Sequence, residues 1–529
     1  MPPPQRRVVA GAVTASRSTA ARVDTLVDEV FSWSGSGERT SAVPHVTADG
    51  SHRRDGAPLQ VLLLSTYELG HQPFGLASPA AWLRATGADV QCYDLSLEML
   101  TEAVVRRADL IAFYLPMHTA TRMAAPMIEQ ARAANPTAHL CAYGLYASPN
   151  AEMLGARGVD TVLGGEFEEP LRRLCLDLAA GSDAATGRQS LPMISLVRQD
   201  FVAPDRTGLP ELSRYAHLRM PDGSRRTTGY TETTRGCKHL CRHCPVVPVY
   251  GGRFRVVQSQ VVAADVAGLV AAGAEHITFG DPDFLNAPKH ALDVVRRLAA
   301  DFPGLSYDVT AKVEHLVHHA ALLPELSATG CVLVTSAVES FDDDVLEIFD
   351  KRHTRADLVK AIRLLADAGI ALNPTFVAFT PWTTAAGYVD FLTSIHDLGL
   401  IGTVAAVQYA IRLLIPAESR LLELADVEAF LGEFDAERLC FDWRHPNPAM
   451  DRLQRELFAV TEEVVDTDLT RGAVFDRIVA ATADVLGGDG ARVLRALPSA
   501  ADAHVEVPHL SEPWFCCAEP VQGQLTPLF

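Results

Sequence analysis

The sequence lacks any long apolar segment. No run of about 18 uninterrupted apolar residues occurs in its 529 residues, so we expect no membrane span. The first residues carry arginines and small side chains but no apolar core of a secretion signal. We therefore expect a disordered leader over residues 1–57 and a cytoplasmic protein.

Positive charge is also scarce. The chain has 46 Lys and Arg residues against 65 Asp and Glu residues, which gives a formal net charge of −19. No basic stripe is present, so the backbone of a nucleic acid is a poor partner for this chain. A small-molecule substrate is the better expectation.

Cysteine is too sparse for a disulfide scaffold, at ten residues in 529. The cysteines are unevenly placed, with three inside eight residues and two adjacent near the end. Such clusters more often indicate metal or redox chemistry than structural bridges. The other five fall in or beside apolar segments and are predicted to be buried packing residues: Cys92, Cys141, Cys175, Cys331 and Cys440.

Short apolar runs alternate with segments of helical spacing in residues 58–185. Five runs separated by helices predict an α/β domain with a Rossmann-like, doubly wound parallel sheet. Ligands of such sheets bind at the carboxyl ends of the strands. The predicted strands are QVLLLST, ADVQCYDLS, DLIAFYLP, HLCAYGL and VDTVLGG.

A second series of strands and helices occupies residues 225–425, after a proline-containing linker over 186–224. Six predicted strands, each followed by a helix, favour a partial (β/α)6 barrel of the TIM type, with its chemistry at the carboxyl ends of the strands. Residues 426–505 are predicted to be mainly helical, and residues 506–529 form an irregular tail. The six strands are GYTETTRG, HITFGDPDF, YDVTAKVE, CVLVTSAVES, IALNPTFVAFTP and TVAAVQYAIRLL.

The first strand of this series leads into three closely spaced cysteines, Cys237, Cys241 and Cys244, with the spacing C-x3-C-x2-C. Three thiolates at this spacing can hold three corners of a [4Fe-4S] cluster and leave the fourth iron open for a ligand. A zinc knuckle is the structural alternative, because His239 or His243 could supply a fourth ligand.

The cysteine spacing and its position resemble the radical S-adenosylmethionine (SAM) superfamily, over about residues 225–420. The resemblance implies an enzyme in which the open iron chelates SAM and a reduced cluster cleaves a carbon–sulfur bond to give a carbon radical. It also implies an electron donor such as flavodoxin or ferredoxin. One departure is His243, which stands where members of the superfamily often carry an aromatic residue.

The resemblance also implies SAM contacts at the ends of the next three strands. A carboxylate at a strand end can accept hydrogen bonds from ribose hydroxyl groups. The alternative for each position is an ordinary polar residue in a loop. The candidates are Gly280, Asp281 and Asp283 after the second strand, Lys312 and Glu314 after the third, and Glu339 and Ser340 at the fourth.

The preceding domain resembles the cobalamin-binding domain found before the barrel in a large subgroup of radical SAM proteins. Its GGEFEEPL segment, Gly164–Leu171, is close to the G-E-G-E turn of that subgroup, and glycines there let the backbone approach a ligand. The sequence has no D-x-H-x-x-G motif. Two interpretations stay open: the domain binds cobalamin, or it has kept the fold and lost the cofactor.

The tail contains Trp514-Phe515-Cys516-Cys517-Ala518-Glu519-Pro520 and resembles radical SAM proteins with a CCAEP or CUAEP ending. Two adjacent thiolates form a soft chelate suited to trivalent arsenic, and a vicinal disulfide or an accidental pair is the alternative. We therefore expect Cys516 and Cys517 to hold the substrate of a radical transferase, with organoarsenical biosynthesis the sharpest hypothesis. The alternatives are a cobalamin-dependent radical SAM methyltransferase and a non-enzymatic metalloid or redox sensor.

Overall fold

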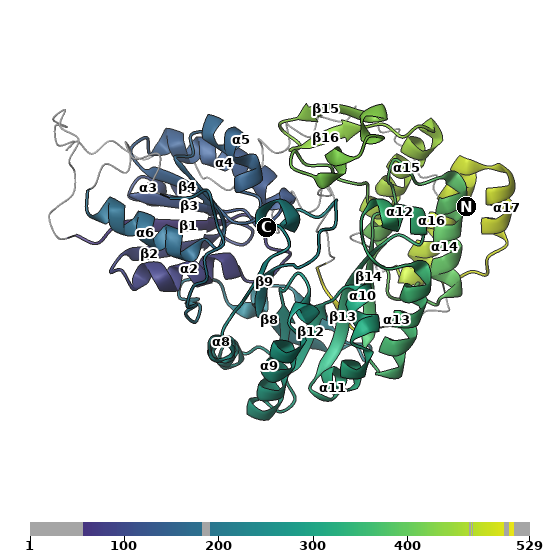
Figure 1. The fold of residues 1–529 in the computed structure, drawn as a ribbon, viewed down its shortest axis with the longest axis horizontal. Coiled ribbons are helices and arrows are strands. Elements are labelled where there is room, and N and C mark those ends of the chain that lie inside the picture. Colours follow the sequence, from purple (N-terminus) through teal and green to yellow (C-terminus); the bar gives the residue numbers. More distant parts are fainter. Residues whose placement is uncertain (1–56, 182–190, 465–466, 468, 502–506, 513–529) are drawn as a thin grey trace, which may run out of the picture.

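The computed structural model describes residues 57–181, 191–464, 467, 469–501 and 507–512. The predicted leader, apart from residue 57, and the cysteine pair Cys516 and Cys517 lie outside the described residues. The described chain contains two sheets that lie side by side along the molecule, with the strand pair around the label β9 between them (Figure 1).

The first sheet is parallel, six-stranded, and has the order β2-β1-β3-β4-β5-β6. It confirms the predicted Rossmann-like fold, and it adds β6, which lies in the stretch assigned to a linker. Its central strands are mostly apolar because both faces of the sheet are buried. The strands are β1 (Gln60–Ser65), β2 (Asp89–Asp94), β3 (Leu110–Tyr114), β4 (His139–Tyr143), β5 (Thr161–Gly165) and β6 (Ile194–Ser195).

Helices cover both faces of this sheet. One apolar cluster joins alternate strand residues to α4, and a second joins the intervening residues to α2 and α6. The strand order reverses between β1 and β3, so a crevice for a ligand is expected at their carboxyl ends. The helices are α2 (Phe74–Arg84), α3 (Glu102–Val105), α4 (His118–Ala134), α5 (Ala151–Ala156) and α6 (Glu168–Ala179).

The second sheet has the order β14-β13-β12-β11-β8-β7-β17, and the five strands from β14 to β8 are parallel. β7 and β17 continue its edge in antiparallel pairing, so the end of the predicted linker belongs to this sheet. The strands are β7 (His217–Arg219), β8 (Arg225–Thr231), β11 (His276–Phe279), β12 (Ser306–Thr310), β13 (Cys331–Glu339), β14 (Ala371–Phe376) and β17 (His509–Leu510).

The sixth predicted strand of the barrel is not a continuous strand. Its segment contains a 3-10 turn over Ala406–Tyr409, and a single parallel bridge joins Phe379 to Arg412. The Gln408 side chain accepts a hydrogen bond from the Phe376 backbone N–H at 2.7 Å. A side chain therefore takes the place of the backbone acceptor that a sixth strand would supply at this point. The fold class, a partial α/β barrel, is confirmed.

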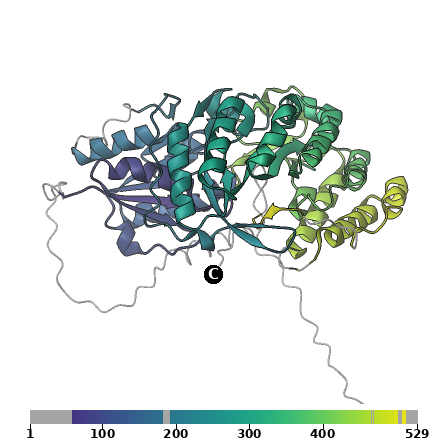
Figure 2. The same ribbon diagram turned by 90° about the horizontal axis from the view of Figure 1, so that it is seen from below.

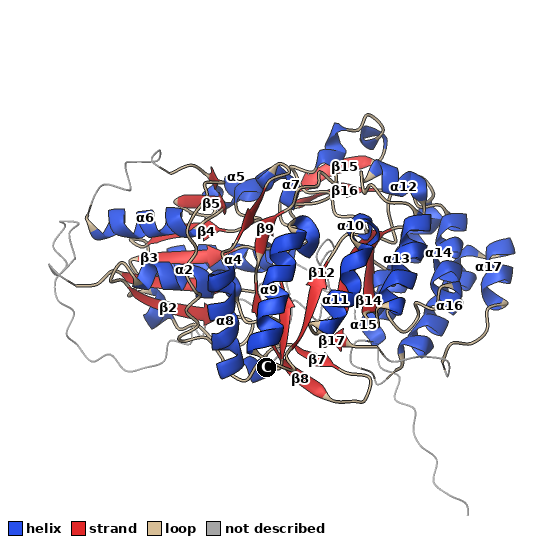
Figure 3. Cartoon of the chain, turned by 60° about the horizontal axis from the view of Figure 1, so that its bottom comes forward, coloured by secondary structure: helices blue, strands red, loops and turns tan. Residues whose placement is uncertain are grey.

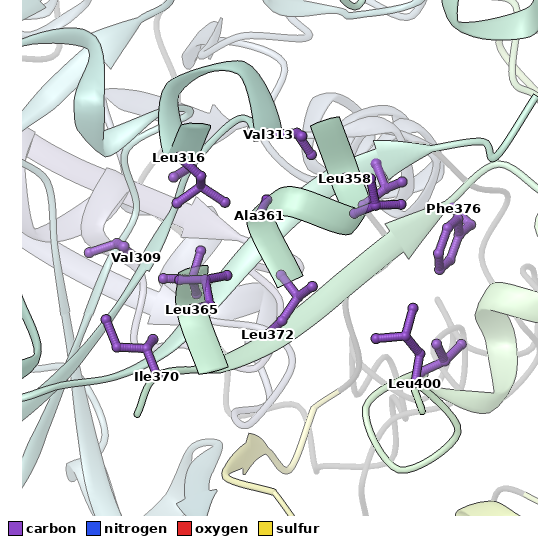
Figure 4. Packing of buried hydrophobic residues seen from close by; sticks show 14 of the residues in the cluster. Val309, Val313, Leu316, Leu358, Ala361, Leu365, Ile370, Leu372, Phe376 and Leu400 are labelled. Atoms are coloured by element: carbon purple, nitrogen blue, oxygen red, sulfur yellow. The ribbon is translucent and has the colours of Figure 1, made fainter. Parts of the chain in front are cut away.

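Helices line the outside of the second sheet (Figure 3). Between sheet and helices lies the largest apolar core of the described chain, part of which is drawn in Figure 4, where Leu358, Ala361 and Leu365 of α13 lie over Leu372 of β14. The helices are α8 (Ser259–Ala271), α9 (Pro288–Asp301), α10 (Val313–His318), α11 (Leu323–Ala328), α12 (Asp343–Ile348), α13 (Arg355–Asp367) and α14 (Ala385–Asp397).

The last described region begins with a hairpin, β15 (Leu431–Asp435) and β16 (Cys440–Trp443), where a mainly helical region was predicted. Three helices follow, α15 (Pro448–Val464), α16 (Arg471–Leu486) and α17 (Gly488–Arg495), and α17 packs on α14 of the barrel. These helices form one end of the molecule (Figure 2). Within the described residues, no helix is long and apolar enough to cross a bilayer.

Candidate active site

The three-cysteine loop lies between the short strand β9 (Thr234–Gly236) and helix α7 (Val246–Tyr250). β9 pairs with β10 (Phe254–Val256), which returns the chain toward the barrel. The loop is tied to the barrel because the Arg242 backbone N–H donates to the Phe349 carbonyl at 3.0 Å, and the Arg420 side chain donates to the Leu240 carbonyl at 3.0 Å. The cysteine backbone is thereby held above the carboxyl ends of the strands.

The cysteine side chains suit an iron–sulfur cluster. Cys241 is buried, and Cys237 and Cys244 are partly exposed. The Lys312 ammonium lies 3.8 Å from the Cys241 sulfur, and the buried Lys351 ammonium interacts electrostatically with Cys241 and Cys244. Burial raises the pKa of Cys237 to about 11, which opposes its thiolate, whereas the nearby Lys312 charge acts in the other direction. Positive charge beside the cysteines favours the thiolates that iron requires. Three thiol donors facing two lysines fit the cluster predicted from the spacing.

A histidine group lies beside the first cysteine. The Cys237 sulfur, a His239 ring nitrogen and an Asp283 carboxylate oxygen lie within 4.8 Å of one another. An Asp283 carboxylate oxygen also lies 2.6 Å from His315 Nδ1. Burial acts to raise the pKa of Asp283, but its two histidine partners outweigh burial and lower this pKa to about 2. His239, Cys237 and Asp283 could therefore hold a metal ion, but this set contains one cysteine and is not the knuckle of three cysteines and a histidine that the sequence left open. His243 takes no part in this group, because its ring pairs with Glu339.

Asp281 binds the segment that leads into the cysteine loop. Its carboxylate accepts hydrogen bonds from the Thr233 backbone N–H at 2.7 Å and from the hydroxyls of Thr233 and Thr234 at 2.5 and 2.6 Å. Burial raises its pKa to about 7. The preceding Gly280 is required for packing, since a Cβ there would collide with the Tyr230 hydroxyl. The structure gives both residues a positioning role, and their assignment to SAM stays a prediction.

Glu339 ends β13 with a positive φ of 70°, a conformation uncommon outside glycine. Its carboxylate receives hydrogen bonds from the Lys351 ammonium and the His243 ring, both at 3.1 Å. Burial opposes ionisation, but Lys351 and then His243 lower the pKa of Glu339 to about 2. Ser340 lies next to it in a hollow of about 180 Å³ and accepts a hydrogen bond from the Asp342 N–H at 3.0 Å. Lys312 and Glu314 form an ion pair at 3.4 Å nearby.

The crevice of the first sheet also presents polar groups. The buried hydroxyls of Ser65, which ends β1, and Ser148, which follows β4, have no hydrogen-bond partner among the described residues, and neither has the Glu68 Oε2 atom. Gly165, the last residue of β5, has a φ of 74°, and a Cβ there would collide with the Ser195 carbonyl. Buried hydroxyl and carboxyl groups without partners are expected where a ligand supplies them. They fit a corrinoid, whose amide side chains carry hydrogen-bond donors and acceptors.

The described chain ends near this crevice. β17 pairs with β7, and two residues later the Glu512 carboxyl accepts a hydrogen bond of 2.5 Å from the Tyr67 hydroxyl in the loop after β1. The adjacent Gly70 packs against the Glu512 side chain. The chain therefore leaves the described region at the junction of the two domains, four positions before Cys516.

Comparison with known protein families assigns both parts of the chain. The family model described as the B12 binding domain matches residues 61–175, and the model described as the radical SAM superfamily matches residues 231–381. The chain carries both domains. The predictions of an enzyme and of its cofactors are therefore confirmed at the level of domains: a radical SAM domain implies a [4Fe-4S] cluster and SAM, and a B12 binding domain implies cobalamin. The narrower resemblance to CCAEP-tail or CUAEP-tail proteins stays a prediction.

Two curated relatives are tRNA-2-methylthio-N(6)-dimethylallyladenosine synthases. The protein of Sorangium cellulosum (strain So ce56) is 29% identical over 203 residues, 33% of this chain and 40% of the relative. That of Jannaschia sp. (strain CCS1) is 26% identical over 282 residues, 50% of this chain and 58% of the relative. The chain thus spans about half the length of these relatives.

Two solved structures share the fold. The radical SAM methyltransferase TsrM from Kitasatospora setae, with cobalamin and a [4Fe-4S] cluster bound, is 18% identical with a TM-score of 0.50, covering 65% of this chain and 70% of that chain. The cobalamin-dependent SAM radical enzyme OxsB with aqua-cobalamin bound is 13% identical with a TM-score of 0.57, covering 83% of this chain and 70% of that chain. Both support the arrangement of a Rossmann-like domain before a partial barrel.

Sequence reasoning missed three residues of the site, namely Arg235, Lys351 and His315. Each contacts a partner that is distant in the chain and that the neighbouring residues do not indicate. Lys351 stands within DKRHT after α12, where a basic residue next to a helix end is unremarkable. The one available signal was proximity to the cysteines, since Arg235 precedes Cys237 by two residues.

Proposed function

We propose that this protein is a cobalamin-dependent radical SAM enzyme that transfers a methyl group to a small-molecule substrate. The observation that supports the proposal is that two candidate cofactor sites lie next to each other. A loop with three thiols and facing lysines lies against a Rossmann crevice whose buried hydroxyls have no partner among the described residues. When bound, a reduced cluster supplies an electron for SAM cleavage, and a corrinoid carries a transferable methyl group.

The residues have distinct roles in this proposal. Cys237, Cys241 and Cys244 would hold the cluster, and Lys312 and Lys351 would offset its negative charge. Asp281 would hold the loop through Thr233 and Thr234 rather than contact SAM.

Lys351 and His243 both donate to Oε1 of Glu339, so the other carboxylate oxygen, Oε2, would accept hydrogen bonds from the ribose. The proposed SAM site would also include Gly280 and Asp283 after β11, Glu314 in α10 and Ser340 after β13. The electron donor would be a protein such as flavodoxin or ferredoxin.

We do not extend the tRNA substrate of the curated relatives to this chain. Its formal net charge of −19 opposes the approach of a polyanion, and the relatives are matched over only part of their length. A small, neutral or cationic substrate suits the acidic balance better.

The arsenic hypothesis rests on Cys516 and Cys517, which lie outside the described residues. One observation supports a role for the tail near the site: the Tyr67–Glu512 contact brings the described end of the chain to the domain junction. No other described feature indicates arsenic, so the methyltransferase proposal takes precedence.

A product assay separates the two. Anaerobically reconstituted protein receives SAM and a reductant, with methylcobalamin in one arm and arsenite in another, and the products are followed by mass spectrometry. Corrinoid-dependent S-adenosylhomocysteine together with 5′-deoxyadenosine supports the methyltransferase. Arsenite-dependent 5′-methylthioadenosine that Cys516→Ser and Cys517→Ser both abolish would instead support the tail hypothesis.

A further inference from the structure

Arg235 connects the cysteine loop to the first domain. It lies on β9, two residues before Cys237, and its side chain is only 7% exposed. Its Nη1 donates to one Glu168 carboxylate oxygen at 2.8 Å, its Nη2 lies 2.7 Å from the other oxygen as an ion pair, and its Nε donates to Glu232 at 2.6 Å. Glu166 lies 3.6 Å away. Two of these three carboxylates belong to the GGEFEEPL turn of the first domain.

Three aromatic rings from different segments at the junction of the two domains surround the Arg235 guanidinium. Its central carbon lies 5.6, 5.1 and 5.0 Å from the ring centres of Phe74, Phe167 and Phe201. These rings belong to α2, to the turn after β5 and to the segment between the domains. An arginine between three ring faces and a bidentate carboxylate has little freedom to move. Figure 1 shows β9 in this position between the two sheets.

The carboxylates of the turn are themselves fixed. Glu168 accepts hydrogen bonds from the Ser78 hydroxyl at 2.6 Å and the Gln199 amide at 2.8 Å. Glu166 accepts a hydrogen bond from the Tyr250 hydroxyl at 3.1 Å, and Tyr250 ends the helix that follows the cysteine loop. The same turn therefore contacts the cysteine loop on both sides, through Arg235 before it and Tyr250 after it.

This turn is also part of the crevice proposed for the corrinoid. Gly164 packs against the Ser148 hydroxyl, and Gly165 directly precedes Glu166. The turn and the cysteine loop share the contacts of Arg235 and Tyr250, so a change in the turn on corrinoid binding would alter the contacts of the loop, and the reverse would hold on cluster loading. Two sites that bias one shared element are coupled thermodynamically, and the coupling is reciprocal.

From these contacts we infer that Arg235 is a positioning residue that links occupancy of the corrinoid site to assembly of the cluster, so that each makes the other bind more tightly. The inference rests on the proposed function, because it requires that the chain bind both groups. It goes further by naming the residue through which the two sites communicate.

The test measures the affinity of the full chain for hydroxocobalamin, by absorbance titration, before and after anaerobic cluster reconstitution. The expected result for the unaltered protein is an affinity gain of about 5-fold to 150-fold on reconstitution, the usual range of coupling between two sites. Arg235→Met should reduce this ratio to about one. Arg235→Lys should restore only part of it, since lysine keeps the charge but loses the bidentate geometry.

The matched control is Arg412→Met. Arg412 also pairs with a carboxylate, Asp451 at 2.8 Å, and lies over the ring of Trp443 at 3.4 Å, but it belongs to the far side of the barrel. It should leave the affinity ratio unchanged. Glu168→Gln, which keeps the volume of the side chain, should lower the ratio even if Arg235→Met fails to fold.

The outcomes separate the inference from the function on which it rests. Tight corrinoid binding that is independent of the cluster in the unaltered protein overturns the inference and leaves the proposed function standing. A coupling ratio that survives in both Arg235→Lys and Glu168→Gln also overturns it. Absence of any corrinoid binding to reconstituted protein removes the proposed function itself. A second readout is the rate of iron loss to a chelator, which hydroxocobalamin should slow in the unaltered protein but not in Glu168→Gln.

Discussion

Replacement of Lys351 by methionine is expected to destabilise the barrel strongly. Lys351 is buried, and its ammonium donates to the Glu339 carboxylate at 3.1 Å. Methionine fills a similar volume without the charge, so the substitution leaves a buried carboxylate with His243 as its remaining hydrogen-bond partner. Removing one member of a buried ion pair costs about 3–5 kcal/mol.

A second route to the magnitude uses the ionisation of Glu339. Burial opposes its charge, but Lys351 and His243 lower its pKa from 4.5 to about 2. Since a tenfold change in an equilibrium corresponds to about 1.4 kcal/mol, this net shift, in which the two partners outweigh burial, favours the folded, ionised state by about 3 kcal/mol. The two routes agree on the order of magnitude.

The assay is thermal unfolding of the cluster-free protein at pH 7. For a unit of the size of this barrel, about 3–5 kcal/mol lowers the midpoint by about 6–20 °C. The control is Lys360→Met on α13, where the side chain is exposed, and it should shift the midpoint by less than about 2 °C. The double variant Lys351→Met with Glu339→Gln should recover much of the loss, because no unpaired charge remains.

The pH dependence has a definite sign. A carboxyl whose folded pKa is below its unfolded value stabilises the protein above the unfolded pKa, and the stabilisation is lost as pH falls toward the folded value. The Glu339 contribution should therefore disappear between about pH 5 and pH 2, and the double variant should lack this part of the decline. A Lys351→Met midpoint within 2 °C of the parent, or a double variant less stable than Lys351→Met, would refute the reasoning.

Three further predictions concern the loop and its supports. Cys241→Ala should abolish retention of iron after anaerobic reconstitution and desalting, whereas Cys331→Ala in the core of the barrel should retain the parental iron content; iron retention by Cys241→Ala would contradict the assignment. Gly280→Ala should destabilise the protein by about 1–3 kcal/mol in urea unfolding because its Cβ meets Tyr230, while Gly268→Ala, in open space on α8, should be neutral or stabilising; equal effects would contradict the packing account. Asp281→Ala should release the loop before Cys237, seen as faster amide exchange in residues 233–236, and unchanged exchange would contradict its positioning role.

The fold was largely predictable because its strands are buried on both faces. Runs such as VLLL in β1 and LIAF in β3 show this burial directly in the sequence. The sixth barrel strand was mispredicted for a specific reason: its apolar residues are buried, but Gln408 supplies the acceptor to Phe376 from a 3-10 turn. A side-chain acceptor leaves the apolar pattern unchanged, so the pattern could not distinguish the two structures.

The candidate site also has a part that the sequence predicts and a part that it does not. The cysteine loop was predictable because its spacing is local, and the structure places it at the strand ends as expected. The electrostatic partners were not predictable, because Arg235 meets Glu168 across 67 positions of the chain and His243 meets Glu339 across 96. The first pair depends on how the two domains pack and the second on how the barrel brings the cysteine loop to the end of β13, and no periodicity within either segment encodes that arrangement.

The most direct test of the account is the cofactor content of the full chain after anaerobic reconstitution with iron, sulfide and hydroxocobalamin, followed by gel filtration. The account predicts about four irons and one corrinoid per chain in the same peak, with both reduced in Cys241→Ala and Glu168→Gln. A protein that retains its iron and elutes without corrinoid would contradict the claim that this chain is a cobalamin-dependent radical SAM enzyme.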